Sequence, residues 1–327
     1  MKKFINDIDD VLVESLSGLV EAHPGLLRVE FEPTFVARTQ RAVNKVALIS
    51  GGGSGHEPLH AGFVGKGMLD AACPGHVFTS PTPDQMLAAA KAVDGGQGVL
   101  FIVKNYAGDG MNFQIASEML ELDNATVLVN DDVAVENSTY TTGRRGVAGT
   151  VIVEKMVGAA AEEGADLYTC KEIGDRVNAH TASMGVAFTS CVVPAAGRAT
   201  FDIGPDQIEM GVGIHGEPGR RREKIKPADL IVKDLMDAIL ADLRPAPGSE
   251  VLLHVNGFGG TPLMELYLLF HSAAKRLRQD QLVLARSLVG NYTTSLEMAG
   301  ASLTVTVLDD EMKRLWDAPV HTTAMHW

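Results

Sequence analysis

Cysteine is scarce in this sequence, and the cysteines that are present are poorly placed for a disulfide framework or a thiolate metal site. Cys73, Cys170 and Cys191 are an odd number, lie far apart and include no C-x-x-C pair. A disulfide-stabilised secreted domain and a zinc ribbon are therefore disfavoured. The pattern predicts a protein of a reducing compartment without a metal site.

The chain also lacks a long apolar segment. No stretch approaches the ~18 uninterrupted apolar residues that a membrane-spanning helix needs. The N-terminus carries Lys2 and Lys3 but then reaches Asp7, Asp9 and Asp10, without the apolar region of a signal peptide. We therefore expect no membrane association and a cytoplasmic location.

Positive charge is in deficit. Lysine and arginine total 28 against 41 aspartates and glutamates, which gives a formal net charge of −13. Binding to nucleic acid is disfavoured because its phosphates require a basic surface. An anionic membrane surface is disfavoured for the same reason.

Sequence patterns that bind nucleotides or metal ions are missing as well. There is no G-x-x-x-x-G-K-[ST] loop, no protein-kinase signature set and no calcium-loop spacing, and the glycines at 51–55 do not have the G-x-G-x-x-G spacing. Asp131 and Asp132 could bind a metal, although capping of a helix or turn explains them more simply. We expect no nucleotide cofactor and no metal in this chain.

Apolar material is plentiful, at 46% of 327 residues, and its arrangement indicates an α/β fold with one or two large units. The runs 46–50, 98–104 and 125–130 are apolar throughout, as is typical of parallel strands covered on both faces. A helix is expected over 82–93, with Thr82 as its cap and Pro83 in its first turn. This alternation is the βαβ rhythm of a parallel sheet.

A second set of elements follows a long helical stretch at 150–177. Its members are an apolar segment at 184–193, helices at 227–243 and 263–277, and strands at 250–256 and 303–308. We predict two α/β domains with largely parallel or mixed sheets, the ligand lying at strand C-terminal ends between the domains. The expected domains are 1–181 and 182–314, with the tail 315–327 packing back on the first.

Glycine-rich loops at strand ends are the candidate binding elements. In Ser50–Pro58, consecutive glycines allow a ligand close to the backbone, and the loop is expected to open a helix. A tight strand-to-helix turn explains the glycines equally well. His56 would ordinarily be a surface or core histidine, but its place in this loop favours function.

Two further loops carry a titratable residue. Asp109 follows the strand at 98–104, and a turn-forming role is the simpler explanation for an aspartate in Ala-Gly-Asp-Gly. His215 lies in Gly211–Gly219, where Gly216 leaves room for a bulky group on its ring. A turn histidine remains an equal alternative there.

These three loops together resemble the K domain of dihydroxyacetone kinases. The similar segments are Ser50–Pro58, Lys104–Asp109 and Gly211–Gly219, joined by 73–75, 78–84, 142–146 and 315–320. The resemblance covers the whole chain, and the segments occur in the family's order. It implies a kinase of the phosphoenolpyruvate-glycerone phosphotransferase type.

The resemblance implies a role for three side chains. His215 would attack the ketone carbon and hold dihydroxyacetone as a covalent hemiaminal through a ring nitrogen. Asp109 would act as the general base for the hydroxyl that is phosphorylated. His56 would hydrogen-bond the substrate and help to polarise it.

Further residues would line the substrate pocket, namely Gly53, Ser54, Gly55 and Lys104. The backbone amides from Gly53 to Gly55, together with His56, would stabilise the substrate oxygen that becomes negative.

In this family the nucleotide belongs to a separate L domain. Since this chain stops at Trp327, it resembles the kind whose K and L parts are separate subunits, and it would be active only with its partner. ADP or ATP with magnesium would sit on the L subunit, recharged by a phosphotransferase-system protein. The family also implies a homodimer.

Two alternatives stay open at the level of sequence. A paralogue could keep the ketone pocket but act as a ligand-sensing coactivator of a transcription factor, although Asp109 favours the kinase because a sensor needs no base. A related ketose such as erythrulose could be the substrate. The sequence fixes neither the phosphoryl donor nor the range of ketoses.

Overall fold

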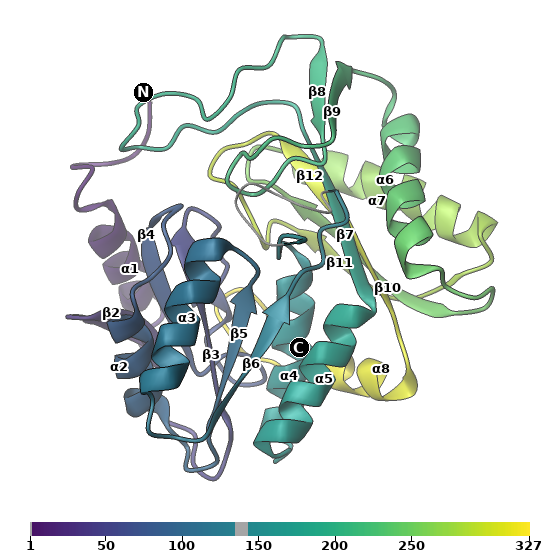
Figure 1. Cartoon of the computed structure of the whole chain (residues 1–327). Coiled ribbons are helices and arrows are strands. Elements are labelled where there is room, and N and C mark those ends of the chain that lie inside the picture. The colour runs from purple at the N-terminus through teal and green to yellow at the C-terminus, as the bar shows by residue number, and fades with distance from the viewer. Residues whose placement is uncertain (1, 135–142) are drawn as a thin grey trace.

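The computed structural model describes residues 2–134 and 143–327, and these form two six-stranded sheets with helices around them (Figure 1). Thr142 of the family-like segment 142–146 lies outside the described residues. The helices are α1 (Val11–Ala22), α2 (Pro83–Val93), α3 (Ala107–Met119), α4 (Gly149–Glu162), α5 (Leu167–Ala179), α6 (Ala228–Leu243), α7 (Leu263–Gln279) and α8 (Asp310–Asp317).

The first sheet has a parallel centre and an antiparallel edge. Its strands in spatial order are β1 (Leu27–Phe31), β2 (Thr34–Arg38), β4 (Ala71–Val77), β3 (Ala47–Ser54), β5 (Val99–Lys104) and β6 (Asn124–Val129). The strands from β4 to β6 are parallel, whereas β1 and β2 pair antiparallel.

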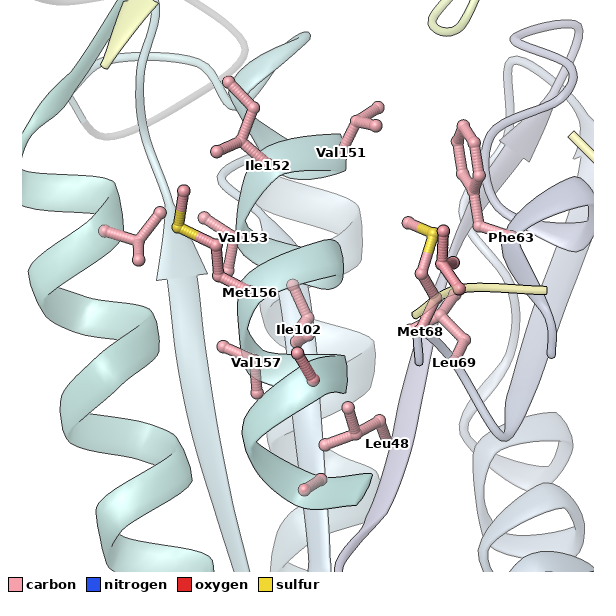
Figure 2. Close-up of a cluster of buried hydrophobic side chains, with 14 of the residues drawn as sticks. Leu48, Phe63, Met68, Leu69, Ile102, Val151, Ile152, Val153, Met156 and Val157 are labelled. Carbon is pink, nitrogen blue, oxygen red and sulfur yellow. The ribbon is translucent and has the colours of Figure 1, made fainter. Parts of the chain in front are cut away.

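The predicted parallel strands are apolar on both faces because helices cover both. Ile49 and Phe101 pack with residues of α2 and α3, while Leu48 and Ile102 pack with α4 on the opposite face. Figure 2 shows this second layer, with Met156 of α4 among the side chains that meet the sheet. Burial of such a side chain contributes roughly 1.5–3 kcal/mol.

The second sheet is mixed and mostly antiparallel, which agrees with the predicted α/β fold of parallel or mixed sheets. Its order is β11 (Val283–Gly290), β10 (Glu250–Gly257), β12 (Gly300–Val307), β7 (Thr181–Ala187), β8 (Gln207–Met210) and β9 (Arg221–Lys224). Only β10 and β11 are parallel. Mixed pairing of this kind cannot be read from runs that are apolar throughout, since burial on both faces gives them in either orientation.

Several predicted boundaries were wrong or incomplete. The helical stretch 150–177 is two helices, because Gly164 has a φ of +91° and ends α4, after which Asp166 accepts a hydrogen bond from the Thr169 amide at 2.8 Å and begins α5. The apolar segment 184–193 is a strand only to Ala187. The helix at 82–93 is confirmed, and its capping partner is Gln85, which accepts from the Thr82 amide at 2.9 Å.

The C-terminal segment returns to the first sheet's helices. Leu315 accepts a hydrogen bond from the Lys155 ammonium of α4 at 2.7 Å, and the His321 amide donates to the Lys66 carbonyl at 2.9 Å. Trp316 and Val320 join the apolar cluster that contains α4. The second sheet begins at Thr181 with β7, and α4 and α5 contact that strand, so they lie between the two sheets.

Close packing of α4 depends on a glycine, and this gives a stability prediction. A Cβ at Gly158 would lie 2.5 Å from the Met68 Cα, which is backbone and cannot move aside cheaply. We expect Gly158→Ala to lower the free energy of unfolding, measured in urea, by about 1–3 kcal/mol. The matched control is Gly18→Ala in α1, where nothing lies within 4 Å of the added Cβ, and it should raise stability by about 0.5–1 kcal/mol. Equal effects at the two positions would contradict this account.

Candidate functional site

The glycines at 51–53 lie inside a strand, which corrects the expected loop. β3 continues to Ser54, and Gly51, Gly52 and Gly53 pair in register with Cys73, Pro74 and Gly75 of β4. No α-helix follows, since the chain turns and forms only the short 3₁₀ helix Ala61–Phe63. The expected helix N-terminus at this loop is therefore absent.

These glycines are needed because other groups occupy the space of a side chain. The Lys104 ammonium fills the position of a Cβ at Gly52, and the Thr79 amide nitrogen would lie 2.6 Å from a Cβ at Gly53. The strand therefore allows two neighbouring segments to approach its backbone.

Asp109 sits in the first turn of α3 rather than in a loop. Its side chain is buried, and its Oδ2 lies 3.5 Å from the Lys104 ammonium at the end of β5. The partial positive charge of the helix N-terminus also lies beside this side chain. Two positive environments thus surround Asp109.

Lys104 is fully buried and turned away from solvent. Its ammonium donates to the Gly51 carbonyl at 3.1 Å and to Nε2 of His60 at 2.8 Å. Lys104 does not line the cleft itself, but it contacts Asp109, which does.

His215 lies in the turn between β8 and β9 and is held by Glu217. The Nδ1 atom of His215 is 2.8 Å from Glu217 Oε1, and the His215 amide donates to Oε2 at 3.0 Å. A carboxylate can only accept, so Nδ1 carries a proton, and in the neutral ring Nε2 holds the lone pair. Gly213 is required beneath this pair, since a Cβ there would lie 2.6 Å from the carboxyl carbon of Glu217.

His56 forms one edge of a cluster of rings. It stacks on Phe78 with centroids 4.9 Å apart and meets His215 edge-on at 4.6 Å, and Tyr106 meets His215 edge-on at 4.6 Å. Nδ1 of His56 donates to the Thr294 carbonyl at 2.8 Å. Nε2 is buried and has no hydrogen-bond partner in the described part of the chain.

The protonation of His56 follows from its surroundings. Burial, aided by the charges of His215 and Lys104, lowers the pKa of His56 well below 6.5 and outweighs the Thr294 hydrogen bond. His56 is therefore neutral, with an accepting Nε2. Its expected role as a donor to a negative oxygen does not fit this tautomer.

Glu217 is ionised because its positively charged neighbours outweigh the effect of its burial. Burial would raise the pKa of Glu217, but the hydrogen bond and charge of His215 and the charge of Arg145 lower it to about 2. Arg145 is itself fully buried and pairs with Asp132. Burial also raises the pKa of Tyr106 well above 10, so its hydroxyl keeps its proton.

A cleft of about 520 Å³ opens between the two sheets at these residues. Its walls are Gly53, Phe78, Ser80, Tyr106, Ala107, Gly108, Asp109, Thr200, His215, Gly216 and Glu217. A larger cavity of about 690 Å³ lies beside α1 and touches neither Asp109 nor His215, so size alone does not identify the site. The chemistry gathers in the smaller cleft.

The predicted substrate-binding residues fall into two groups. Gly53, Asp109 and His215 line the cleft, and His56 touches the His215 ring. Ser54 and Gly55 line the larger cavity instead, and Lys104 is buried and lines neither. Their assignment to substrate binding stays a prediction.

The polar groups of Ser54 and Gly55 already have hydrogen-bond partners within the chain. The Ser54 hydroxyl donates to the Gly75 carbonyl at 2.7 Å, and the Gly55 amide donates to both Glu57 oxygens at 3.0 Å. In this structure the Gly55 amide is therefore already paired within the chain.

Sequence reasoning assigned no role to Glu217, Tyr106 or Phe78. Glu217 stands two residues after His215 in a glycine-rich turn, and that spacing was the available signal for a carboxylate that orients an imidazole. Nothing in the sequence indicates that the rings of Phe78 and Tyr106 meet His215, because these contacts join distant segments.

No metal centre is found where the structure describes the chain. No group of three or more His, Cys, Asp or Glu side chains among the described residues could hold an ion. Asp131 accepts from the amides of Val147 and Gly149 at 2.8 and 2.7 Å, which caps the start of α4. Among the same residues, no helix has the length and apolar character to cross a membrane.

The family model of the Dak1 domain matches residues 17–324 of this chain. The chain belongs to this family. It is 47% identical to the dihydroxyacetone-binding subunit DhaK of PEP-dependent dihydroxyacetone kinase from Escherichia coli (strain K12), covering 100% of this chain and 99% of that protein. It is 49% identical to the DhaK subunit of PTS-dependent dihydroxyacetone kinase 1 from Listeria innocua, covering 95% of each.

Solved structures agree on the fold. The dihydroxyacetone kinase of C. freundii matches with a TM-score of 0.88 at 36% identity, covering 98% of this chain and 60% of that one. The dihydroxyacetone kinase operon co-activator Dha-DhaQ matches with a TM-score of 0.89 at 32% identity, covering 98% of both chains.

The low pKa of Glu217 predicts a pH-dependent contribution to stability. A carboxylate with a folded pKa of about 2 and an unfolded value near 4.5 stabilises the fold above pH 4.5 and loses this as pH falls toward 2. The stability difference between wild type and Glu217→Gln should therefore change by on the order of 3 kcal/mol over that window. Urea unfolding at several pH values measures it.

The control is Glu154→Gln, at a fully buried carboxyl group. Burial raises the pKa of Glu154 to about 8, so the stability difference between wild type and this variant should change in the opposite direction as pH rises from about 4.5 to 8. A Glu217→Gln protein that keeps the wild-type slope would show that His215 and Arg145 do not hold Glu217 ionised.

Proposed function

We propose that this chain is the ketone-binding subunit of a two-part cytoplasmic dihydroxyacetone kinase. It captures dihydroxyacetone as a hemiaminal on His215 and presents a hydroxyl to Asp109 for phosphorylation. The observation that carries the proposal is the Glu217 hydrogen bond to Nδ1 of His215, which leaves Nε2 as a nucleophile at the cleft. The names of the DhaK relatives support the substrate.

Capture is an addition across the carbonyl. The Nε2 lone pair of His215 forms the new C–N bond while the C=O π electrons move to oxygen. That oxygen takes up a proton from solvent, and Nδ1 releases its proton through Glu217, so the product is neutral overall. Holding the carbonyl beside the ring supplies the effective concentration that a free imidazole lacks in water, up to ~10⁵ M or more.

The neighbouring groups divide the recognition of the bound ketone. The Tyr106 hydroxyl is neutral, buried and without a hydrogen-bond partner among the described residues, so it can donate to the oxygen that becomes negative. His56 Nε2 can accept from a substrate hydroxyl. Glycerol has no carbonyl and is rejected by this capture step.

Transfer then requires a base. Asp109 borders the cleft, and its Oδ2 lies 3.5 Å from the Lys104 ammonium, so it is placed to take the proton of the attacking hydroxyl. The phosphoryl donor would be nucleotide on a separate L-type subunit, recharged by a phosphotransferase-system protein, as the words "PTS-dependent" and "subunit" in the relatives' names support.

A second function has a specific observation in its favour. The co-activator Dha-DhaQ matches over 98% of its length, so a ligand-sensing role in transcription is compatible with this fold. Identity is lower there, at 32% against 47% for the E. coli subunit, and Asp109 fits a kinase. We therefore place the kinase first.

Two variants test the proposal by separating capture from transfer. With dihydroxyacetone, native mass spectrometry of wild type should show one substrate mass per chain, and His215→Asn should show none. Asp109→Asn should keep the adduct but lower phosphorylation, assayed with an L-type subunit and its donor, by ~10²–10⁴. The kinase assay without the L-type subunit is the control and should give no product.

The outcomes discriminate among the alternatives. An adduct that survives His215→Asn would rule out capture by this residue. Normal phosphorylation by the Asp109→Asn variant would show that Asp109 does not act as the general base. A wild-type adduct with no phosphorylation under any donor would favour the sensor.

A further inference from the structure

A line of buried polar groups runs from α4 to the start of α3 behind the cleft. Glu154 Oε1 lies 2.6 Å from His60 Nδ1, and the Lys104 ammonium lies 2.8 Å from His60 Nε2 and 3.5 Å from Asp109 Oδ2. Glu154 and Lys104 are fully buried, and His60 and Asp109 nearly so. The capture and transfer steps use neither Glu154 nor His60.

The direction of each hydrogen bond follows from the lysine. An ammonium has three donors and no acceptor, and those of Lys104 face Gly51 O, His60 Nε2 and Asp109. His60 Nε2 must therefore accept. Its proton is then on Nδ1, which donates to Glu154.

His60 is neutral in this arrangement. Burial, with the charges of Lys104 and His56, lowers the pKa of His60 well below 6.5. Both of its ring nitrogens are engaged, and the Ser50 hydroxyl lies 3.0 Å from Nδ1. The ring cannot rotate without losing hydrogen bonds in a buried place, which is unfavourable.

The line therefore fixes an otherwise flexible cation. A lysine has a four-carbon stem and a mobile ammonium, whereas Lys104 is held between His60 and Asp109. If the His60 ring turned away, the Lys104 ammonium would lose one of its hydrogen-bond acceptors and could leave its position beside Asp109. Misplacement of a catalytic group by about 1 Å can reduce a rate by ~10².

The protonation state of Glu154 affects the balance of charge along this line of buried groups. The charged and titratable groups facing it are Lys104, His60, His56 and Asp109, with Ser50 as a polar neighbour. Burial raises the pKa of Glu154 to about 8, opposed by Lys104 and Ser50. At neutral pH Glu154 is mostly protonated, and Asp109 is the carboxyl group that lies beside Lys104.

We propose that Glu154 and His60 are positioning residues for Asp109, with Glu154 orienting His60 so that Lys104 is fixed against the Asp109 carboxylate. This inference rests on the proposed role of Asp109 as base. Ionisation of Glu154 would draw Lys104 toward His60 and away from Asp109.

The test uses the complete kinase with its L-type subunit and compares two variants of one residue. Glu154→Leu removes the acceptor for His60 and should lower kcat about tenfold, with the KM for dihydroxyacetone and the mass adduct unchanged within about twofold. Glu154→Gln keeps an acceptor oxygen and should restore kcat to within about twofold of wild type at pH 7. Thr150→Val is the matched control, since it lies one turn earlier on α4 and its buried hydroxyl has no partner among the described residues.

The pH profile supplies a readout that a purely structural role would not move. Wild-type kcat should fall above about pH 8 as Glu154 ionises, whereas Glu154→Gln should stay level there. A Glu154→Leu enzyme with normal kcat, or with a raised KM alone, would overturn the proposal. If that variant does not fold, identical alkaline profiles of wild type and Glu154→Gln would overturn it.

Failure of the proposed function is distinguishable. Asp109→Asn, measured in parallel, should lose transfer whatever Glu154 does. Full activity of Asp109→Asn would show that Asp109 is not the base. The absence of an adduct on the wild-type protein would refute the capture step.

Discussion

The hydrogen bond between Glu217 and His215 is the interaction on which the chemistry of this cleft depends. It determines which ring nitrogen carries the proton and which keeps the lone pair. Three features maintain it: the His215 amide binds the same carboxylate, Gly213 leaves space for it, and the buried Arg145 keeps it ionised. An imidazole whose Nδ1 proton is held by Glu217 is thereby presented to a ketone, and burial of the rings around it excludes competing water.

The fold brings this nucleophile to a base from the other sheet. His215 lies in the turn that joins β8 and β9 of the second sheet. Asp109 lies in the first turn of α3, which follows β5 of the first sheet. Helix α4 lies between the sheets and packs tightly where Gly158 meets Met68. The same helix contributes Glu154 to the line that ends at Asp109. Packing and polar contacts of one helix thus connect the core to the site.

Sequence patterns predicted the parts of the structure that depend on local chemistry. The strands at 46–50, 98–104 and 125–130 were found because burial on both faces leaves an unbroken apolar run, and the family resemblance is confirmed by the Dak1 match. Mixed sheets were predicted, but the pattern did not say which strands of the second sheet pair antiparallel, because pairing depends on partners far away in the chain. For the same reason Lys104 was expected in the pocket wall, whereas its position behind Gly52 is set by a strand whose Gly51 lies 53 residues earlier. Glu217 was within reach of sequence reasoning, and the Phe78 and Tyr106 contacts were not.

The central claim is that His215 forms a covalent bond to the ketone through Nε2. The most direct measurement is diffraction from crystals soaked with dihydroxyacetone near neutral pH. The account predicts continuous electron density from Nε2 to the former carbonyl carbon at a single-bond length of roughly 1.45 Å, with that carbon tetrahedral. A planar ketone more than ~3 Å from the ring, or density joined to Lys104 instead, would contradict it.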